Sequence, residues 1–241
     1  DADGLVLATT NLLLGTDGVE RLGVPFVAAW LVPATPTRCA PNVLTPELPR
    51  WCAGRGFYNQ LTHHIFAVLR RGLLGRMHEQ ALGALPEPDW MQSGPVPVLY
   101  GYIPEVFARP PDWPAHAQVV GYWSMESPAS FRPPAELAEF LAAGTAPVYV
   151  GFGSMSNRDP QAATQLVCEA LERAGCRGVL VTAWGGLHST GLPSHVLAFD
   201  SVPHDWLFPR VAAVVHHCGA GTTGAGLRAG VPTVGVPHFA D

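Results

Sequence analysis

The chain has 241 residues, of which 48% are hydrophobic and 14% charged, and its formal net charge is −5. This length suits one large domain or two modest ones with a buried core. The weak negative charge argues against a nucleic-acid partner and leaves no polybasic patch for a membrane surface. No apolar run is long enough to span a bilayer, and no signal peptide is recognisable. Five cysteines without a C-x-x-C pair fit a reduced, cytoplasmic setting.

All fourteen basic residues are arginines, and the chain contains no lysine. A P-loop needs a lysine after its second glycine, so this kind of phosphate site is excluded, as is any lysine Schiff base. The chain opens with Asp-Ala-Asp-Gly and enters a strand-like run at once, with no initiator methionine. Both ends are therefore expected to be cuts through a longer protein.

The first half of the chain alternates short apolar runs with irregular segments. Strands are predicted at 5–9, 24–31 and 96–100, and a proline-rich loop at 33–49. Residues 57–74 carry apolar side chains at helical spacing, which predicts a surface helix packed on the sheet or, alternatively, one that partly lines an apolar acceptor pocket. The adjacent His63 and His64 on this helix would point in different directions, so they do not predict a metal site.

The second half follows a more regular pattern. Residues 124–144 are rich in proline and alanine and are expected to connect two domains, with a short helix at 134–143. Asp159 is placed to cap a helix that starts at Pro160. Strands and helices then alternate, which predicts a doubly wound parallel sheet. The expected strands are 147–150, 179–183, 196–199, 211–215 and 231–236, with a short helix at 203–210.

The segment between the last two strands is rich in glycine and is the best candidate for a ligand site. His217 follows the strand 211–215, and Gly219, Gly221 and Gly224 let a ligand approach the backbone closely. Thr222 and Thr223 add hydroxyls to the same turn. The free N–H groups and positive dipole end of the following helix complete a predicted phosphate site.

The same residues also match a second phosphate motif. Gly219-Ala-Gly221-Thr-Thr-Gly224 is a literal G-x-G-x-x-G, the fingerprint of dinucleotide-binding domains. That motif requires an acidic residue at the tip of the next strand, where this chain has Val236-Pro237. A dinucleotide-dependent oxidoreductase therefore remains an alternative with a weaker basis.

A longer pattern of residues resembles a known family. Three segments together are similar to the nucleotide-sugar signature of family 1 glycosyltransferases. They are His216-His217-Cys218-Gly219-Ala220-Gly221-Thr222-Thr223, then 226–232 (Gly-Leu-Arg-Ala-Gly-Val-Pro) and 237–241 (Pro-His-Phe-Ala-Asp). The sterol 3-O-glucosyltransferase branch, with its bacterial macrolide and glycopeptide relatives, is the most similar. Segments 33–38, 112–114 and 121–123 resemble the same branch, so the resemblance covers nearly the whole chain. Cys218 stands where the family usually has glycine.

The resemblance implies a GT-B fold of two Rossmann-like domains, both incomplete in this chain. Residues 1–123 would be the later part of an acceptor-side domain, and residues 124–241 a linker and the first part of the nucleotide-sugar domain. It further implies a set of donor contacts. The donor diphosphate would be held by His217, Gly219, Gly221, Thr222 and Thr223, with Gly153 and Ser154 beside it. The uracil would be bracketed by backbone groups of the segment 201–204, which includes Val202 and His204. Asp241 would contact sugar hydroxyls. Trp184 is expected either to stack on the base or to cap the sheet edge.

The implied reaction is inverting transfer of a hexose, glucose first, from a UDP-sugar to a hydroxyl of a hydrophobic acceptor such as a sterol. The helix N-terminus and His217 would neutralise the leaving diphosphate, so neither a metal nor a bound cofactor is required. The general base of the family is a histidine expected before Asp1, so none of the ten histidines here is assigned that role. A cytoplasmic protein with peripheral membrane contact is compatible with this reading. A non-catalytic homologue that binds only a nucleotide or lipid is a further alternative.

Overall fold

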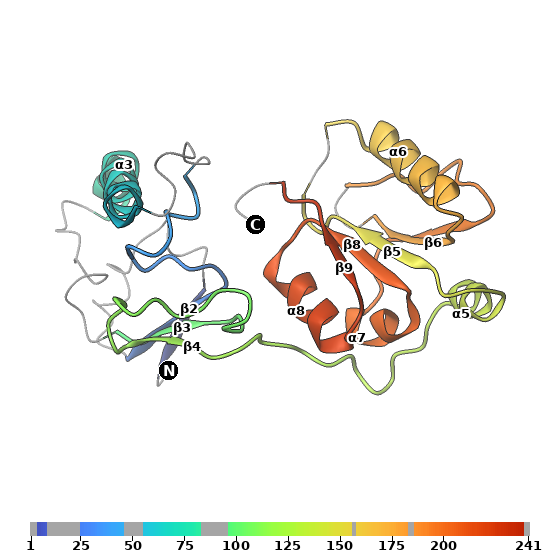
Figure 1. Ribbon diagram of the computed structural model, residues 1–241, viewed down its shortest axis with the longest axis horizontal. Helices are drawn as coiled ribbons and strands as arrows, with labels where there is room; N and C mark the ends of the chain where they lie inside the picture. The colour runs from blue at the N-terminus through green and yellow to red at the C-terminus, as the bar shows by residue number, and fades with distance from the viewer. Residues whose placement is uncertain are drawn as a thin grey trace. The chain divides into compact units, whose positions relative to one another are not determined.

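The computed structural model describes residues 4–8, 25–45, 55–82, 96–155, 158–182 and 186–238. The chain divides into two compact units, Asp1–Tyr122 and Trp123–Asp241, called here the N-terminal and the C-terminal unit. Figure 1 shows a parallel sheet in each of them. Each unit is described by itself below.

The N-terminal unit contains a four-stranded parallel sheet in the order β1-β2-β3-β4. The strands predicted at 5–9, 24–31 and 96–100 are confirmed with narrower bounds. The fourth strand was not predicted, because it has only three residues, follows a proline-rich segment and has the polar Gln118 at its centre. The elements are β1 (Leu5–Ala8), β2 (Phe26–Trp30), α3 (Gly56–Leu82), β3 (Val98–Tyr100) and β4 (Ala117–Val119).

An aromatic cluster forms the core of the N-terminal unit and fixes the proline-rich loop on it. The ring of Tyr100 stacks on Trp113 with centroids 4.5 Å apart and meets Trp30 edge-on at 5.8 Å. The Tyr100 hydroxyl accepts a hydrogen bond from the Thr35 amide at 2.7 Å, and Trp113 Nε1 donates to the Thr35 carbonyl at 3.0 Å. The predicted loop is therefore irregular but anchored by buried hydrogen bonds.

Helix α3 does not pack its apolar side on the sheet, contrary to the prediction. Among the α3 side chains that the structure describes, the buried ones are polar, with Asn59, Thr62 and His63 only 2–6% exposed. His63 Nε2 lies 3.1 Å from the Ala40 carbonyl, and Thr62 Oγ1 accepts from the Asn42 amide at 2.8 Å. The loop 33–45 presents backbone polar groups that need partners, and the polar side of α3 supplies them. The apolar side chains Phe57, Leu61, Ile65, Val68 and Leu69 are exposed.

The C-terminal unit is a five-stranded parallel sheet in the order β7-β6-β5-β8-β9, which confirms the predicted doubly wound arrangement. Asp159 caps its long helix as expected, accepting from the Ala162 amide at 2.9 Å. The elements are α5 (Ala135–Ala142), β5 (Val148–Gly151), α6 (Pro160–Arg173), β6 (Gly178–Val181), β7 (Val196–Phe199), α7 (His204–Leu207), the 3-10 turn η1 (Phe208–Arg210), β8 (Ala213–His216), α8 (Ala220–Ala229) and β9 (Thr233–Gly235).

Alternate residues along the strands build a separate core on each face of this sheet. Tyr149, Val179 and Val214 pack with α5, α7 and α8 on one face. Val150 and Leu180 pack with α6 on the other face. Figure 1 shows α6 on the opposite side of this sheet from α8. The chain proceeds from β5 outward through β6 to β7 and then returns to β8 on the opposite side of β5. The order reverses between β5 and β8, so ligands are expected at the C-terminal ends of these two strands.

Candidate functional site

Helix α8 starts earlier than its sequence suggested. Its N-cap is Gly219, and the amide of Thr223 donates to the Gly219 carbonyl at 3.0 Å, which closes the first helical turn. Gly221, Thr222 and Thr223 therefore lie in the first turns of α8, and their predicted placement in a turn before the helix is wrong. Gly230 ends the helix in the left-handed region, with φ 66°, as the sequence predicted.

The N-terminus of α8 offers donors and space for an anion. The amides of Ala220, Gly221 and Thr222 precede the first bonded amide, so they have no partner within the helix. A Cβ placed on the exposed Gly221 would meet no atom within 4 Å. The positive end of the helix dipole lies at the same point. Backbone donors, open space and dipole together form an anion-binding position.

The side chains of Thr222 and Thr223 are less available to a ligand than the sequence predicted. Thr223 Oγ1 donates toward the carbonyls of Cys218 and Gly219, at 3.0 and 3.1 Å, so its proton is engaged inside the protein. The side chain of Thr222 is buried. The structure therefore assigns the available donors at this position to the backbone.

His217 occupies the switch point between β5 and β8. It follows the last residue of β8, and its ring lies between two glycines. A Cβ on Gly153, in the loop after β5, would stand 2.6 Å from the His217 Cε1 atom, and one on Gly219 would stand 2.3 Å from Nε2. Gly153 also has φ 58°, a conformation that side chains rarely adopt. The two glycines thus make the place that the imidazole fills.

The hydrogen bonding of this histidine differs from that of its neighbour. His217 is 8% exposed, and its Nδ1 atom is buried without a hydrogen-bond partner among the described residues. His216 Nδ1, by contrast, accepts from the Cys218 amide at 3.1 Å. Buried polar atoms without partners are uncommon, and a ligand is one explanation for such an atom. His217 is accordingly the side chain at this edge with an unused polar atom.

Cys218 takes a backbone conformation suited to glycine. Its φ is 73°, the one positive value among the described residues other than glycine. A Cβ on Gly235 of β9 would stand 2.5 Å from its sulfur, so the side chain is packed against that strand. The glycine usual in the resembling family at this position thus has a conformational reason.

The segment 201–204 lies at the C-terminal end of β7 and leads into α7. Val202 is 4% exposed and belongs to the core, so only its backbone is free to face a ligand. The His204 ring stacks on Phe208 at 4.5 Å, and its Nε2 lies 3.2 Å from the hydroxyl of Tyr149. Burial, and then the nearby His216, lower the pKa of His204, while Asp205 opposes them. The sequence did not indicate the partnership with Tyr149, because it joins residues on different elements.

The remaining predicted site residues are only partly described. Ser154 is exposed in the loop after β5, next to Gly153. Trp184 and Asp241 lie outside the described residues. Within the described ranges, no group of three or more His, Cys, Asp or Glu side chains is placed to hold a metal ion. In the same ranges, no helix is both long and apolar enough to cross a membrane.

Comparisons with known proteins agree with this geometry. Residues 179–241 match the family described as erythromycin biosynthesis protein CIII-like, C-terminal domain. The chain is 37% identical over 254 residues to a sterol 3-beta-glucosyltransferase of Penicillium rubens, covering 98% of this chain and 18% of the relative. It is also 37% identical over 231 residues to sterol 3-beta-glucosyltransferase UGT80A2 of Arabidopsis thaliana, covering 94% and 36%. The chain thus spans well under half the length of these curated relatives.

Solved structures show the same fold. The glycosyltransferase SnogD from Streptomyces nogalater matches with a TM-score of 0.58 and 23% identity, covering 98% of this chain and 54% of that one. A UDP-glucose: anthocyanidin 3-O-glucosyltransferase in complex with UDP matches with a TM-score of 0.56 and 18% identity, covering 99% and 58%. These structures confirm the expected α/β architecture of the GT-B type. The chain is therefore similar in sequence to the sterol 3-beta-glucosyltransferases and has the fold of the GT-B glycosyltransferases.

Proposed function

We propose that the protein transfers a hexose, glucose in the first instance, from a UDP-sugar to a hydroxyl of a sterol or a similar lipophilic acceptor. One observation carries the proposal: His217 lies between two glycines beside the open N-terminus of α8, and its buried Nδ1 atom has no partner among the described residues. The position is the switch point of a parallel sheet, where nucleotides bind in open α/β folds. The sterol 3-beta-glucosyltransferase relatives support the class of donor and acceptor.

The donor would lie along the C-terminal edge of the C-terminal sheet. The amides of Ala220, Gly221 and Thr222 and the ring of His217 hold the diphosphate, with Gly153 and Ser154 beside it. The backbone of 201–204, which includes Val202 and His204, brackets the uracil. Gly219 and Thr223 hold this arrangement in place. Trp184 is proposed to stack on the base, and Asp241 to accept hydrogen bonds from hydroxyls of the hexose, because a carboxylate suits hydroxyls better than phosphate.

The chemistry proposed is an inverting displacement at the anomeric carbon. A general base removes the proton of the acceptor hydroxyl as the hydroxyl oxygen attacks, and the bond to the UDP oxygen breaks. Negative charge develops on the diphosphate as it leaves, and the α8 amides, the helix dipole and His217 stabilise that charge. This role needs no metal ion. No histidine of this chain is assigned the role of base.

Residues 1–123 are proposed to serve the acceptor, and residues 124–241 the donor. A lipophilic acceptor partitions into membranes, so we propose a cytoplasmic protein with peripheral membrane contact. No nucleic-acid partner is proposed.

A thermal-shift screen of the full-length protein separates this proposal from its rivals. Ligands that bind the native state raise its melting temperature according to their concentration and affinity. The glycosyltransferase proposal expects stabilisation by UDP and UDP-glucose but not by NAD. Stabilisation by NAD alone would favour the dinucleotide alternative based on the G-x-G-x-x-G match. Stabilisation by UDP without sugar transfer to any sterol tested would favour a non-catalytic homologue.

A further inference from the structure

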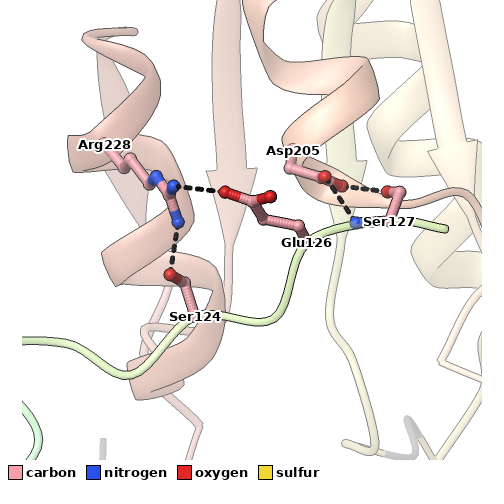
Figure 2. Close-up of polar contacts among 5 residues, drawn as sticks. All are labelled: Ser124, Glu126, Ser127, Asp205 and Arg228. Atoms are coloured by element: carbon pink, nitrogen blue, oxygen red, sulfur yellow. Dashed lines mark hydrogen bonds and ion pairs between the residues drawn. The ribbon is translucent and has the colours of Figure 1, made fainter. Parts of the chain in front are cut away.

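Two charged side chains hold the first residues of the C-terminal unit against its surface (Figure 2). The Arg228 guanidinium, in the last turn of α8, donates to the Ser124 hydroxyl and lies 3.4 Å from a carboxylate oxygen of Glu126. Asp205, in α7, accepts from the Ser127 amide at 2.8 Å and from the Ser127 hydroxyl. Ser124 and Arg228 are 104 positions apart in the chain, and Ser127 and Asp205 are 78 apart. Both contacts are therefore tertiary rather than local.

A third, apolar contact continues this attachment. The ring of Phe131 meets Trp206 edge-on at 5.7 Å, and the Arg210 guanidinium lies 4.5 Å from the centroid of the same tryptophan ring. Residues 124–131, called here the strap, therefore follow α8 and α7 before the chain enters α5. The strap belongs to the C-terminal unit by its contacts.

The residues just before the strap belong equally clearly to the N-terminal unit. The amide of Val120 donates to the Tyr100 carbonyl and that of Gly121 to the Tyr102 carbonyl, both at 3.0 Å. Tyr122 packs against the aromatic core of the same unit. Within the part of the chain that the structure describes, no hydrogen bond of Tyr122 or Trp123 is recorded. Trp123 is 46% exposed, and Gly121 has φ 87°.

We propose that the linker between the two units is a short hinge confined to Tyr122 and Trp123, and that Arg228 and Asp205 are the positioning residues that keep it short. Gly121 is the last residue with a backbone hydrogen bond to the N-terminal unit, and Ser124 is the first with a hydrogen bond to the C-terminal unit, among the described residues. If Arg228 is lost, the unbonded stretch grows to 122–126, and if Asp205 is lost as well, it grows to 122–130. A longer free linker lets the two units sample a larger volume and lowers the effective concentration of one for the other.

A double variant is more informative than a single one. Exposed ion pairs and hydrogen bonds each contribute little to stability, so one substitution would release the strap only partly. The double variant Arg228→Ala/Asp205→Ala removes both polar anchors. The matched control is Glu172→Ala/Arg173→Ala, which removes one acid and one arginine from the exposed end of α6, where neither side chain contacts the strap. Both double variants leave the net charge unchanged.

The hinge is tested first by a distance measurement that does not depend on enzymatic activity. Nitroxide labels are placed in the full-length protein at the exposed Cys39 and at Gln161→Cys, one in each unit, with the other cysteines replaced. Pulsed electron resonance then gives the distribution of distances between the labels. The strap variant should broaden this distribution relative to the parent and to the α6 control. Equal widths in all three proteins would overturn the proposal.

A kinetic test rests on the proposed function and extends it. The strap variant should lower kcat with UDP-glucose by about three- to ten-fold, because productive approach of the acceptor unit becomes rarer. Calorimetric affinity for UDP alone should stay within about two-fold of the parent, because neither replaced side chain is proposed to contact the donor. A matching loss of UDP affinity would mean that the strap supports the donor site itself, and the positioning role would be wrong. If the parent protein transfers no sugar, the proposed function fails while the distance measurement still decides the hinge.

Discussion

The imidazole of His217 lies against Gly153 so closely that a Cβ on the glycine would stand 2.6 Å from the ring carbon Cε1. The two residues follow neighbouring parallel strands, β8 and β5, between which the strand order reverses. Their contact therefore joins the two loops where a parallel α/β sheet places its ligand. This contact also explains why glycine is needed at position 153, whereas the next residue in the loop, Ser154, has an exposed side chain.

The packing of His217 on Gly219 gives a prediction about ligand affinity. Gly219 has φ −53°, which alanine adopts freely, so Gly219→Ala strains no backbone angle. Its Cβ would stand 2.3 Å from His217 Nε2, so the ring must move. We expect the affinity for UDP to fall at least about ten-fold, measured by calorimetry on the full-length protein. Gly72→Ala, in open space on α3, is the control and should bind UDP normally.

His217 itself should matter more for turnover than for stability. Removal of its proposed hydrogen bond to the diphosphate should lower kcat/KM of His217→Ala by about ten- to a hundred-fold, or about 1.5–3 kcal/mol of transition-state stabilisation. No internal hydrogen bond of its Nδ1 atom is recorded among the described residues, so none is lost there on substitution. His188→Ala, at an exposed position, should leave kcat/KM unchanged. An unchanged value for His217→Ala would remove this residue from the site.

The lowered pKa of His204 predicts a pH dependence of stability. Burial, followed by the charge of His216, disfavours the protonated ring in the folded state. Its stabilising contribution is therefore complete above the ordinary histidine pKa of 6.5 and declines as pH falls below that value. His204→Gln keeps a partner for the Tyr149 hydroxyl but cannot be protonated, so its urea midpoint should decline less between pH 7 and pH 5. Because burial also lowers the pKa of His63, the urea midpoint of both proteins should still decline somewhat as pH falls. Identical slopes would contradict the assignment.

Two tyrosines of the N-terminal unit form a matched pair. The Tyr100 hydroxyl makes hydrogen bonds with the amide and the hydroxyl of Thr35, at 2.7 and 2.6 Å, whereas the buried Tyr102 hydroxyl has no partner among the described residues. Tyr100→Phe leaves the Thr35 amide unpaired and should cost about 1–3 kcal/mol of unfolding free energy. Tyr102→Phe should cost nothing measurable or stabilise slightly. Chemical denaturation of both variants checks this, and equal costs would contradict the hydrogen bonding described.

Much of the fold follows from local sequence. The strands of both sheets are short Val-, Leu- and Ala-rich runs, and the Asp159-Pro160 pair and Gly230 mark a helix start and a helix end by their own chemistry. The start of α8 was less predictable, because glycine is as common in a phosphate turn as at an N-cap. The exposed apolar side of α3 was not predictable at all, since only the position of the loop 33–45 reveals that polar groups are needed beneath the helix.

The candidate site, too, was only partly predictable from the sequence. His217, the glycines around it and the helix N-terminus could be identified from order along the chain and from the family resemblance. The contacts of His217 with Gly153, of His204 with Tyr149, and of Arg228 with the strap join distant residues. No spacing rule encodes such contacts, because they depend on which strands become neighbours.

Gly221 offers the most direct test of the claim that the N-terminus of α8 holds the donor diphosphate. Outside its chain neighbours and the backbone of α8, a Cβ at this position meets no atom within 4 Å, so Gly221→Val should fold normally and place its branched side chain where the phosphate is proposed to lie. The measurement is a calorimetric titration of UDP into the full-length variant, alongside its circular dichroism spectrum. We expect a native spectrum with no detectable UDP binding. Native affinity for UDP in a natively folded Gly221→Val protein would contradict it.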